Sequence, residues 1–300
     1  MAVAHLGVMI EAQEGLTWAR WRRIVADSER LGFAALRVSD HCQSVFGVEG
    51  RESLSAWIAL ALAAEWTERI QLGPMVSPMT FYVPAVLARQ ALAVDELSGG
   101  RVIMGVGTGW NAAEHERFGI PFPPAWGERF DRLEAGIARV RAVFASAGRD
   151  VPFLIGGGGA RRTRTIAARE ASEWNTGAPD AATFASMSAA LDARCAELGR
   201  SPAEIRRSLM KGVLIGRDAS ELRERALRMA SVVPRLQVGD AGAVLAAARE
   251  RWFVGTPDEV AAQMRPFAEA GVELFLLQHF LLDDPGVLEL LAREVAPALA

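Results

Sequence analysis

Apolar residues along this chain fall into two alternating kinds of segment. Short, nearly continuous apolar runs are typical of buried parallel strands, and longer stretches with an apolar residue every three or four positions are typical of helices. The two kinds follow one another along the whole chain. The pattern predicts strands at His5–Ile10, Ala34–Ser39, Ile70–Val76, Arg101–Gly107, Val151–Gly156, "ASEWNTG" (171–177), "RRSLMKGVLIG" (206–216) and Glu273–His279.

A helix is predicted after each of these strands. Several helical segments have residues that commonly flank helices, such as Pro84 near a start, Gly32 at an end and Thr256 as a cap. The segment between Gly107 and Trp126 is predicted to be irregular, and 231–253 is ambiguous. The predicted helices are Leu16–Gly32, Ser53–Thr67, Pro84–Gly100, Glu128–Ala147, Arg161–Arg169, Ala181–Leu198, one that begins near Ser220, Thr256–Gly271 and Pro285–Ala300.

Eight strand–helix units in 300 residues predict an α/β fold, a (β/α)8 TIM barrel with insertions. A doubly wound open sheet is the competing fold, and the strand count favours the barrel. Nothing resembles a linker, so residues 1–300 are expected to form one domain. In such a barrel the chemistry lies at the carboxyl ends of the strands, which are rich here in Gly, His, Asp, Asn and Trp.

Composition and charge exclude several classes of partner. The net charge of −3 gives no basic surface for nucleic acid, and no apolar run is long enough to span a membrane. The first fifteen residues contain Glu11 and lack the basic start of a signal peptide. Two cysteines far apart do not indicate a disulfide framework. We therefore expect a cytoplasmic protein that acts on a small-molecule substrate.

The run Ser39-Asp40-His41 follows a strand of the buried type. A carboxylate beside an imidazole at a strand end can hold a cofactor ring and move a proton, so Asp40 and His41 are the candidate catalytic residues. The alternative is a helix cap next to a surface histidine. The four histidines show no metal-binding spacing, and no metal is expected.

Three other strand ends carry glycine or proline. "GPMVSPM" (73–79) predicts either a bulge or an ordinary strand exit, and "GTGWN" (107–111) permits a ligand to lie against the backbone. The glycines at 156–159 precede a predicted helix, whose free amides would attract phosphate. Their spacing fits neither a G-x-G-x-x-G fingerprint nor a P-loop, and a flexible turn is the alternative. Arg161, Arg162 and Arg164 either reach an acidic group or face water.

Taken together, "LGFAALRVSDH", "DELSGGRVIMGVGTGWN" and "FLIGGGGARRTRTIAAREASEWN" resemble the bacterial luciferase-like flavin-dependent oxidoreductase superfamily. The resemblance covers most of the chain, and it is strongest to the branch that uses the deazaflavin coenzyme F420. It implies a luciferase-like TIM barrel, a homodimer, and hydride transfer between F420 and a small organic substrate.

The resemblance also implies roles for individual residues. Asp40 and His41 would lie near the deazaflavin ring, with His41 as general acid or base. Met75, Val76 and Ser77 would form a bulge behind the ring, where the family often has a non-prolyl cis peptide. The other implied cofactor-binding residues are Gly107, Thr108, Gly109, Asn111, Gly156, Gly157, Gly158, Gly159, Trp174 and Asn175.

Two alternatives remain open beside the F420-dependent oxidoreductase. One is an FMN-dependent monooxygenase of the same superfamily, which would use reduced flavin and oxygen. The other is a cofactor-binding barrel without catalysis. The Asp40-His41 pair and the glycine run favour the first reading. Relatives that oxidise a sugar phosphate have a glutamate where this chain has Trp110, which argues against that substrate and leaves the substrate open.

Overall fold

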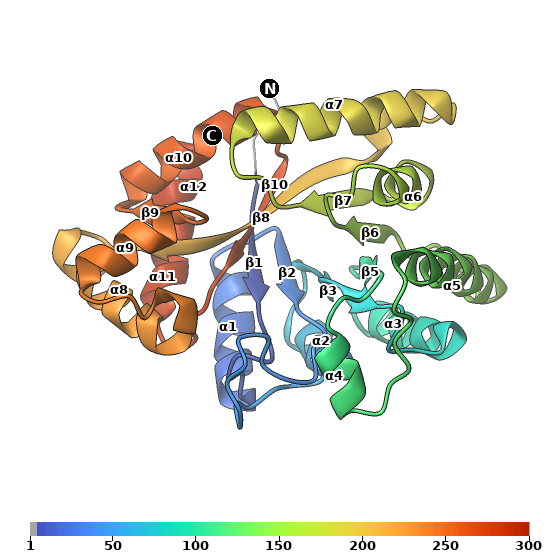
Figure 1. Ribbon diagram of the computed structural model, residues 1–300, viewed down its shortest axis with the longest axis horizontal. Helices are drawn as coiled ribbons and strands as arrows, with labels where there is room; N and C mark the ends of the chain where they lie inside the picture. The colour runs from blue at the N-terminus through green and yellow to red at the C-terminus, as the bar shows by residue number, and fades with distance from the viewer. Residues whose placement is uncertain (1–4, 300) are drawn as a thin grey trace.

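Parallel strands form the centre of the molecule and helices surround them (Figure 1). The computed structural model describes residues 5–299. Residues 1–4 and Ala300 lie outside the described residues. The first four belong to the amino-terminal segment without a signal-peptide pattern, and Ala300 is the last residue of the predicted domain. The strands are β1 (His5–Ile10), β2 (Ala35–Val38), β3 (Gln71–Pro74), β4 (Ser77–Pro78), β5 (Met104–Gly107), β6 (Phe153–Gly156), β7 (Glu173–Thr176), β8 (Arg206–Ile215), β9 (Phe253–Gly255) and β10 (Leu274–Gln278).

The sheet closes on itself into a barrel. Strand order is β3-β2-β1-β10-β8-β7-β6-β5-β4, and β9 pairs with β8 outside this path. Between the ends of the path, the Leu72 amide donates to the Arg101 carbonyl (3.0 Å) and the Ile103 amide donates to the Leu72 carbonyl (2.8 Å). Strand β4 continues β3 after a short interruption and pairs with β5. The (β/α)8 barrel predicted from the sequence is confirmed.

Most of the longer helices pack on the outside of the barrel through an apolar face (Figure 1). In α1 the buried residues Trp21, Ile24, Val25 and Ser28 recur at helical spacing, and Thr17 caps the first turn. A capping box formed by Thr256 begins α10. The helices are α1 (Trp18–Arg30), α2 (Ala56–Trp66), α3 (Pro84–Leu97), α4 (Ala112–Arg117), α5 (Trp126–Ser146), α6 (Arg162–Glu170), α7 (Ala181–Glu197), α8 (Ala219–Val232), α9 (Ala241–Arg249), α10 (Pro257–Glu269), α11 (Pro285–Leu290) and α12 (Ala296–Ala298).

A buried charged network fills the amino-terminal end of the barrel. Arg37 and Glu173 have fully buried side chains with 3.3 Å between Nη2 and Oε2. Arg206 also pairs with Glu173, Arg37 donates to Gln71 Oε1 (2.7 Å), and the Ser208 hydroxyl donates to Glu173 Oε1 (2.7 Å). Each buried charge therefore has partners, as burial in a medium of low polarity requires.

The structure adds elements where the sequence pattern was weak. The segment predicted to be irregular contains α4, and the ambiguous segment 231–253 contains the end of α8, a 3-10 turn at Pro234–Leu236, α9 and the start of β9. The predicted closing helix is broken into α11, a π turn at Leu291–Val295 and α12. Within residues 5–299, no helix has the length and apolarity needed to cross a bilayer.

Candidate functional site

A cavity of about 680 Å³ lies at the carboxyl ends of the barrel strands. The structure brings most of the predicted site residues to its wall, and it places four of them, Asp40, Ser77, Trp174 and Asn175, outside the lining. The predicted residues that line the cavity are His41, Met75, Val76, Gly107, Thr108, Gly109, Asn111, Gly156, Gly157, Gly158 and Gly159.

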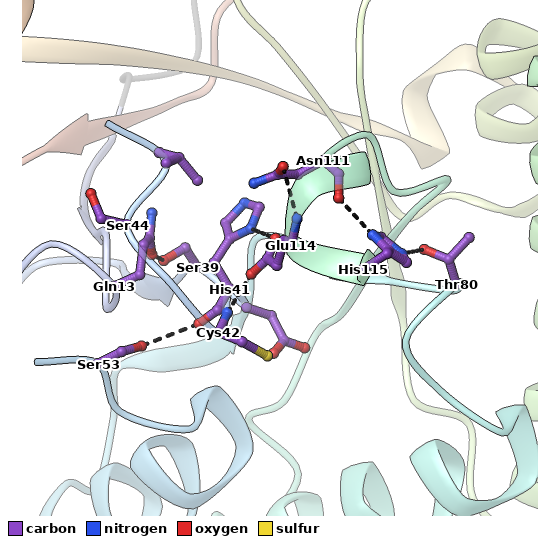
Figure 2. Close-up of polar contacts among 12 residues, drawn as sticks. Gln13, Ser39, His41, Cys42, Ser44, Ser53, Thr80, Asn111, Glu114 and His115 are labelled. Carbon is purple, nitrogen blue, oxygen red and sulfur yellow. Dashed lines mark hydrogen bonds and ion pairs between the residues drawn. The ribbon is translucent and has the colours of Figure 1, made fainter. Parts of the chain in front are cut away.

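His41 forms the clearest polar contact in this cavity. Its Nδ1 lies 2.8 Å from Glu114 Oε2, and the Glu114 side chain is fully buried, whereas the His41 side chain is 17% exposed (Figure 2). A carboxylate oxygen only accepts, so Nδ1 carries the hydrogen. Among residues 5–299, Nε2 of His41 has no hydrogen-bond partner. The ring therefore presents Nε2 to a ligand in the cavity.

The surroundings of His41 shift its pKa upward. Burial acts to lower the pKa, but the hydrogen bond and charge of Glu114, together with the charges of Glu11 and Asp40, outweigh it. The imidazole therefore keeps its proton to a higher pH than a free histidine. An imidazole that holds its proton more firmly than a free histidine is suited to act as a general acid or base.

Glu114 is a site residue that the sequence analysis missed. It lies on α4, where Asn111 caps the helix and accepts from the Glu114 amide (3.3 Å). Its second carboxylate oxygen accepts from the Cys42 amide, so Glu114 joins α4 to the end of β2 (Figure 2). The signal was present in the sequence, because an asparagine followed three residues later by glutamate is typical of a helix start.

Asp40 lies behind the cavity wall instead of facing a ligand. Its carboxylate accepts from the Ser77 hydroxyl (2.5 Å) and the Tyr82 hydroxyl (2.8 Å), and Trp57 Nε1 donates to Ser77 Oγ (3.1 Å). Burial raises the pKa of Asp40 against the opposing effect of these two hydroxyl donors. Both hydroxyl distances are to Oδ2, and the Tyr82 hydroxyl also lies 3.0 Å from Oδ1, so the carboxylate of Asp40 links the end of β2 to β4.

Val76 forms the floor of the cavity between two strand-end glycines. The Met75–Val76 peptide bond is cis, in the segment where the sequence analysis expected a bulge. A β-carbon at Gly107 would come within 2.7 Å of Val76 Cγ2, and one at Gly156 within 3.0 Å of Val76 Cγ1. Glycine at both positions therefore lets the Val76 side chain stand at the strand ends.

The loop after β5 is held by two buried side chains of neighbouring segments. Arg129 Nη1 donates to the Gly109 carbonyl (3.2 Å), and its guanidinium lies 3.8 Å from the centroid of the Trp126 ring. His115 Nδ1 donates to the Asn111 carbonyl (2.7 Å), which leaves Nε2 to accept from the Thr80 hydroxyl (2.8 Å) (Figure 2). These contacts fix the part of the wall that carries Thr108 and Asn111.

The glycine loop presents free amides to the cavity at the start of α6. The Gly157 amide donates to the Asn175 carbonyl (2.9 Å), and Trp174 Nε1 donates to the Gly157 carbonyl (3.0 Å). Trp174 and Asn175 therefore support the loop from behind. The amides of Gly158 and Gly159 find no acceptor within residues 5–299. Two free amides at a helix amino terminus match the needs of a phosphate group.

Of the three arginines after this loop, Arg162 is turned away from the cavity. It pairs with Asp131 (2.7 Å) and Glu134 (3.0 Å) on α5. Arg161 and Arg164 do not line the cavity, and neither forms an ion pair with another described residue. The amides, and not the guanidinium groups, are therefore the donors that face the cavity.

Comparisons with known proteins place this chain among related enzymes. The F420-dependent glucose-6-phosphate dehydrogenase of Intrasporangium calvum is 37% identical over 121 residues, which are 39% of this chain and 35% of that protein. The chain thus spans about a third of the length of such curated relatives.

Two solved structures share the whole fold. An F420-dependent secondary alcohol dehydrogenase, solved with an F420–acetone adduct, gives a TM-score of 0.82 at 16% identity and full coverage of both chains. The oxygenating part of 3,6-diketocamphane monooxygenase of Pseudomonas putida, a Baeyer-Villiger enzyme solved with FMN, gives 0.79 at 16% identity with 99% of each chain covered. The family model for luciferase-like monooxygenases matches residues 1–274. With that match and this barrel, the chain belongs to the luciferase-like monooxygenase family.

Proposed function

We propose that the protein is an oxidoreductase that transfers a hydride between the deazaflavin coenzyme F420 and a small organic substrate. The observation that carries the proposal is His41, whose Glu114 contact leaves Nε2 directed at a cavity that also receives the free amides of the glycine loop. The names of the curated relatives and of the alcohol dehydrogenase support F420 as the coenzyme.

The residues of the cavity fit such a coenzyme. The amides of Gly158 and Gly159 would bind its phosphate, and Val76 would lie against the face of its ring. When bound, the coenzyme supplies the hydride acceptor or donor. His41 would give or take a proton at Nε2, and Glu114 fixes the orientation of the imidazole through Nδ1.

The proposal is tested by binding and turnover of the purified protein. We expect F420 to bind with submicromolar affinity, measured by fluorescence titration. The protein should then oxidise alcohols with F420, or reduce ketones or enones with reduced F420. The absorbance of the coenzyme measures the reaction across a panel of these substrates. Tight binding of FMN without binding of F420 would contradict the proposal.

An FMN-dependent monooxygenase is the second candidate, favoured by the family description and by the FMN-bound Baeyer-Villiger structure. Such an enzyme uses oxygen. This candidate would be supported if the protein consumed oxygen with reduced FMN and formed an oxygenated product. The rate of oxygen consumption with reduced F420 is the control measurement.

Gly157→Ala is expected to weaken F420 binding at least tenfold, about 1.4 kcal/mol. Gly157 has φ +121°, a conformation that side-chain-bearing residues rarely adopt, so alanine would shift the loop that presents the amides. Gly148→Ala is the matched control, because Gly148 also has positive φ (66°) and lies in open space after α5. Both variants should lose stability, and only Gly157→Ala should lose affinity. Equal affinity in the two would contradict the loop's role.

Glu114→Gln is expected to lower the pKa of His41. The substitution removes the hydrogen-bonded charge that raises this pKa, and burial, which lowers it, remains. The pKa of His41 is higher in the folded protein than in the unfolded chain. The stability that the His41–Glu114 pair contributes is therefore complete at a pH below the pKa of the unfolded chain, and it is lost as the pH rises through the pKa of the folded protein. An NMR titration of the imidazole measures the shift. The pH above which turnover falls should move downward with it, and an unmoved NMR midpoint would contradict the argument.

The proposal extends to the whole chain. Residues 1–300 would act as one domain, in a cytoplasmic homodimer that binds no nucleic acid. Apolar side chains exposed on neighbouring helices α2 and α3, at Ile58, Val83 and Val86, support a dimer. Free Cys42 and Cys195 support a reducing compartment. Sedimentation at micromolar concentration tests the oligomeric state.

A further inference from the structure

A second cavity of about 470 Å³ adjoins the main one at the same end of the barrel. Met210 of β8 lines both cavities. Gln278, which lines the second, donates to Glu11, which lines the first, with 2.6 Å between Nε2 and Oε1. Apart from Met210, the residues that line the main cavity lie between β1 and α6, and those that line the second lie between the end of β7 and the end of β10. The two cavities therefore adjoin at Met210.

The charged residues of the second cavity leave it with excess positive charge. Lys211, Arg235 and Arg251 line it against one carboxylate, Glu250. Within residues 5–299, neither Arg235 nor Arg251 forms an ion pair or a side-chain hydrogen bond. Most arginines that line the other cavities of this chain have carboxylate partners, as Arg228 has Asp284. Two unpaired guanidinium groups at one cavity can donate hydrogen bonds to an oxyanion.

Aromatic residues hold Arg235 at the cavity. Its guanidinium carbon lies 5.6 Å from the centroid of the Trp252 ring and 6.0 Å from that of Phe46. Trp252 in turn stacks on Phe280 with 5.3 Å between ring centroids. Burial, and then the like charge of Arg251, lower the pKa of Arg235, and a bound anion would offset the repulsion between the two guanidinium groups. The cation is thus positioned by stacking, with its hydrogen-bond donors left free.

We propose that the second cavity binds an anionic group, a carboxylate or a phosphate, carried by the substrate at the end remote from its reacting carbon. The statement that the group belongs to a substrate rests on the proposed function. The reacting carbon would lie in the main cavity near His41, and the anionic group would lie between Arg235 and Arg251. The coenzyme phosphate has its own place at the glycine loop on the β6 side. The substrate class is therefore a small anionic organic molecule.

The proposal is tested with two simple anions and a pair of substitutions. The protein saturated with F420 is titrated with sodium succinate and with sodium phosphate, against sodium chloride of equal ionic strength, by calorimetry. We expect at least one anion to bind saturably, and the Arg235→Gln/Arg251→Gln double variant to lose at least tenfold in affinity. Binding of succinate alone assigns a carboxylate, and binding of phosphate alone assigns a phosphate.

Controls separate this proposal from the proposed function. Arg249→Gln removes one positive charge at an exposed helix end outside the cavity, the same change as either single arginine substitution, and should bind the anion like the unaltered protein. The double variant should bind F420 with unchanged affinity, and a tenfold loss there would overturn the proposal by assigning the arginines to the coenzyme. Equal anion binding by the double variant, or no saturable binding at all, would also overturn it. If F420 binds none of the proteins, the proposed function fails, and the titrations without coenzyme still decide the anion site.

Discussion

His41→Ala is expected to reduce turnover by about 10² to 10⁴, the usual contribution of a positioned acid or base, while the affinity for F420 changes less than threefold. The imidazole is the group on the cavity wall with a raised pKa and an unpartnered nitrogen. The Glu114 carboxylate beside it is fully buried and is occupied by His41 Nδ1 and the Cys42 amide. Loss of the ring therefore removes the proton donor and leaves the glycine loop intact.

The measurements are kcat, KM and the F420 dissociation constant of the variant, with the most active substrate of the panel. His5→Ala is the matched control, because His5 is exposed at the opposite, amino-terminal end of β1. Activity within threefold of the unaltered protein would remove His41 from the mechanism. A loss of F420 affinity as large as the loss of turnover would assign His41 to coenzyme binding and contradict the role as acid.

Glu173→Ala is expected to lower the free energy of unfolding by about 3 to 5 kcal/mol, the cost of leaving a buried charge without its partner. Arg37 is fully buried, and Glu173 is its carboxylate partner at 3.3 Å. Burial acts to raise the pKa of Glu173, but the charges of Arg37 and Arg206 outweigh it and the pKa is lowered. Because the pKa of Glu173 is lower in the folded protein, the carboxylate contributes stability at a pH above its pKa in the unfolded chain. This stability is lost as the pH falls through its pKa in the folded protein.

Urea denaturation at pH 7 and in acid measures both effects. The stability difference between Glu173→Ala and the unaltered protein should shrink as pH falls. Glu197→Ala is the control, because Glu197 is an exposed carboxylate that pairs with Arg194 on the surface of α7, and such pairs contribute about 1 kcal/mol or less. A Glu173→Ala variant as stable as Glu197→Ala would show that the buried network adds little.

The barrel could be predicted from the sequence because its strands are nearly continuous apolar runs separated by helices. The contact between His41 and Glu114 could not, since it joins residues 73 positions apart that only closure of the barrel brings together. The six-residue helix that carries Glu114 has too few apolar residues for a periodic signal. The two unpaired arginines beside Trp252 lie in or near the segment where the pattern was ambiguous.

Four predicted site residues lie outside the cavity lining because the sequence locates the end of a strand and does not fix the contacts of each side chain there. A strand end can be located from sequence, but side chains alternate from one face of a strand to the other. Trp174 therefore packs outward on Phe184 of α7, and its neighbour Asn175 points into the barrel, where it donates to Ser208. Asp40 likewise lies against β4 while His41 lines the cavity.

The charged network of Arg37, Glu173 and Arg206 has a consequence for the order of binding. It fills the amino-terminal end of the barrel, so the proposed coenzyme and substrate would both enter at the carboxyl ends of the strands. Val76 at the floor of that mouth is the proposed support of the coenzyme ring, and a substrate lying over the ring would cover it. We therefore expect ordered sequential steady-state kinetics, in which the coenzyme binds first and leaves last.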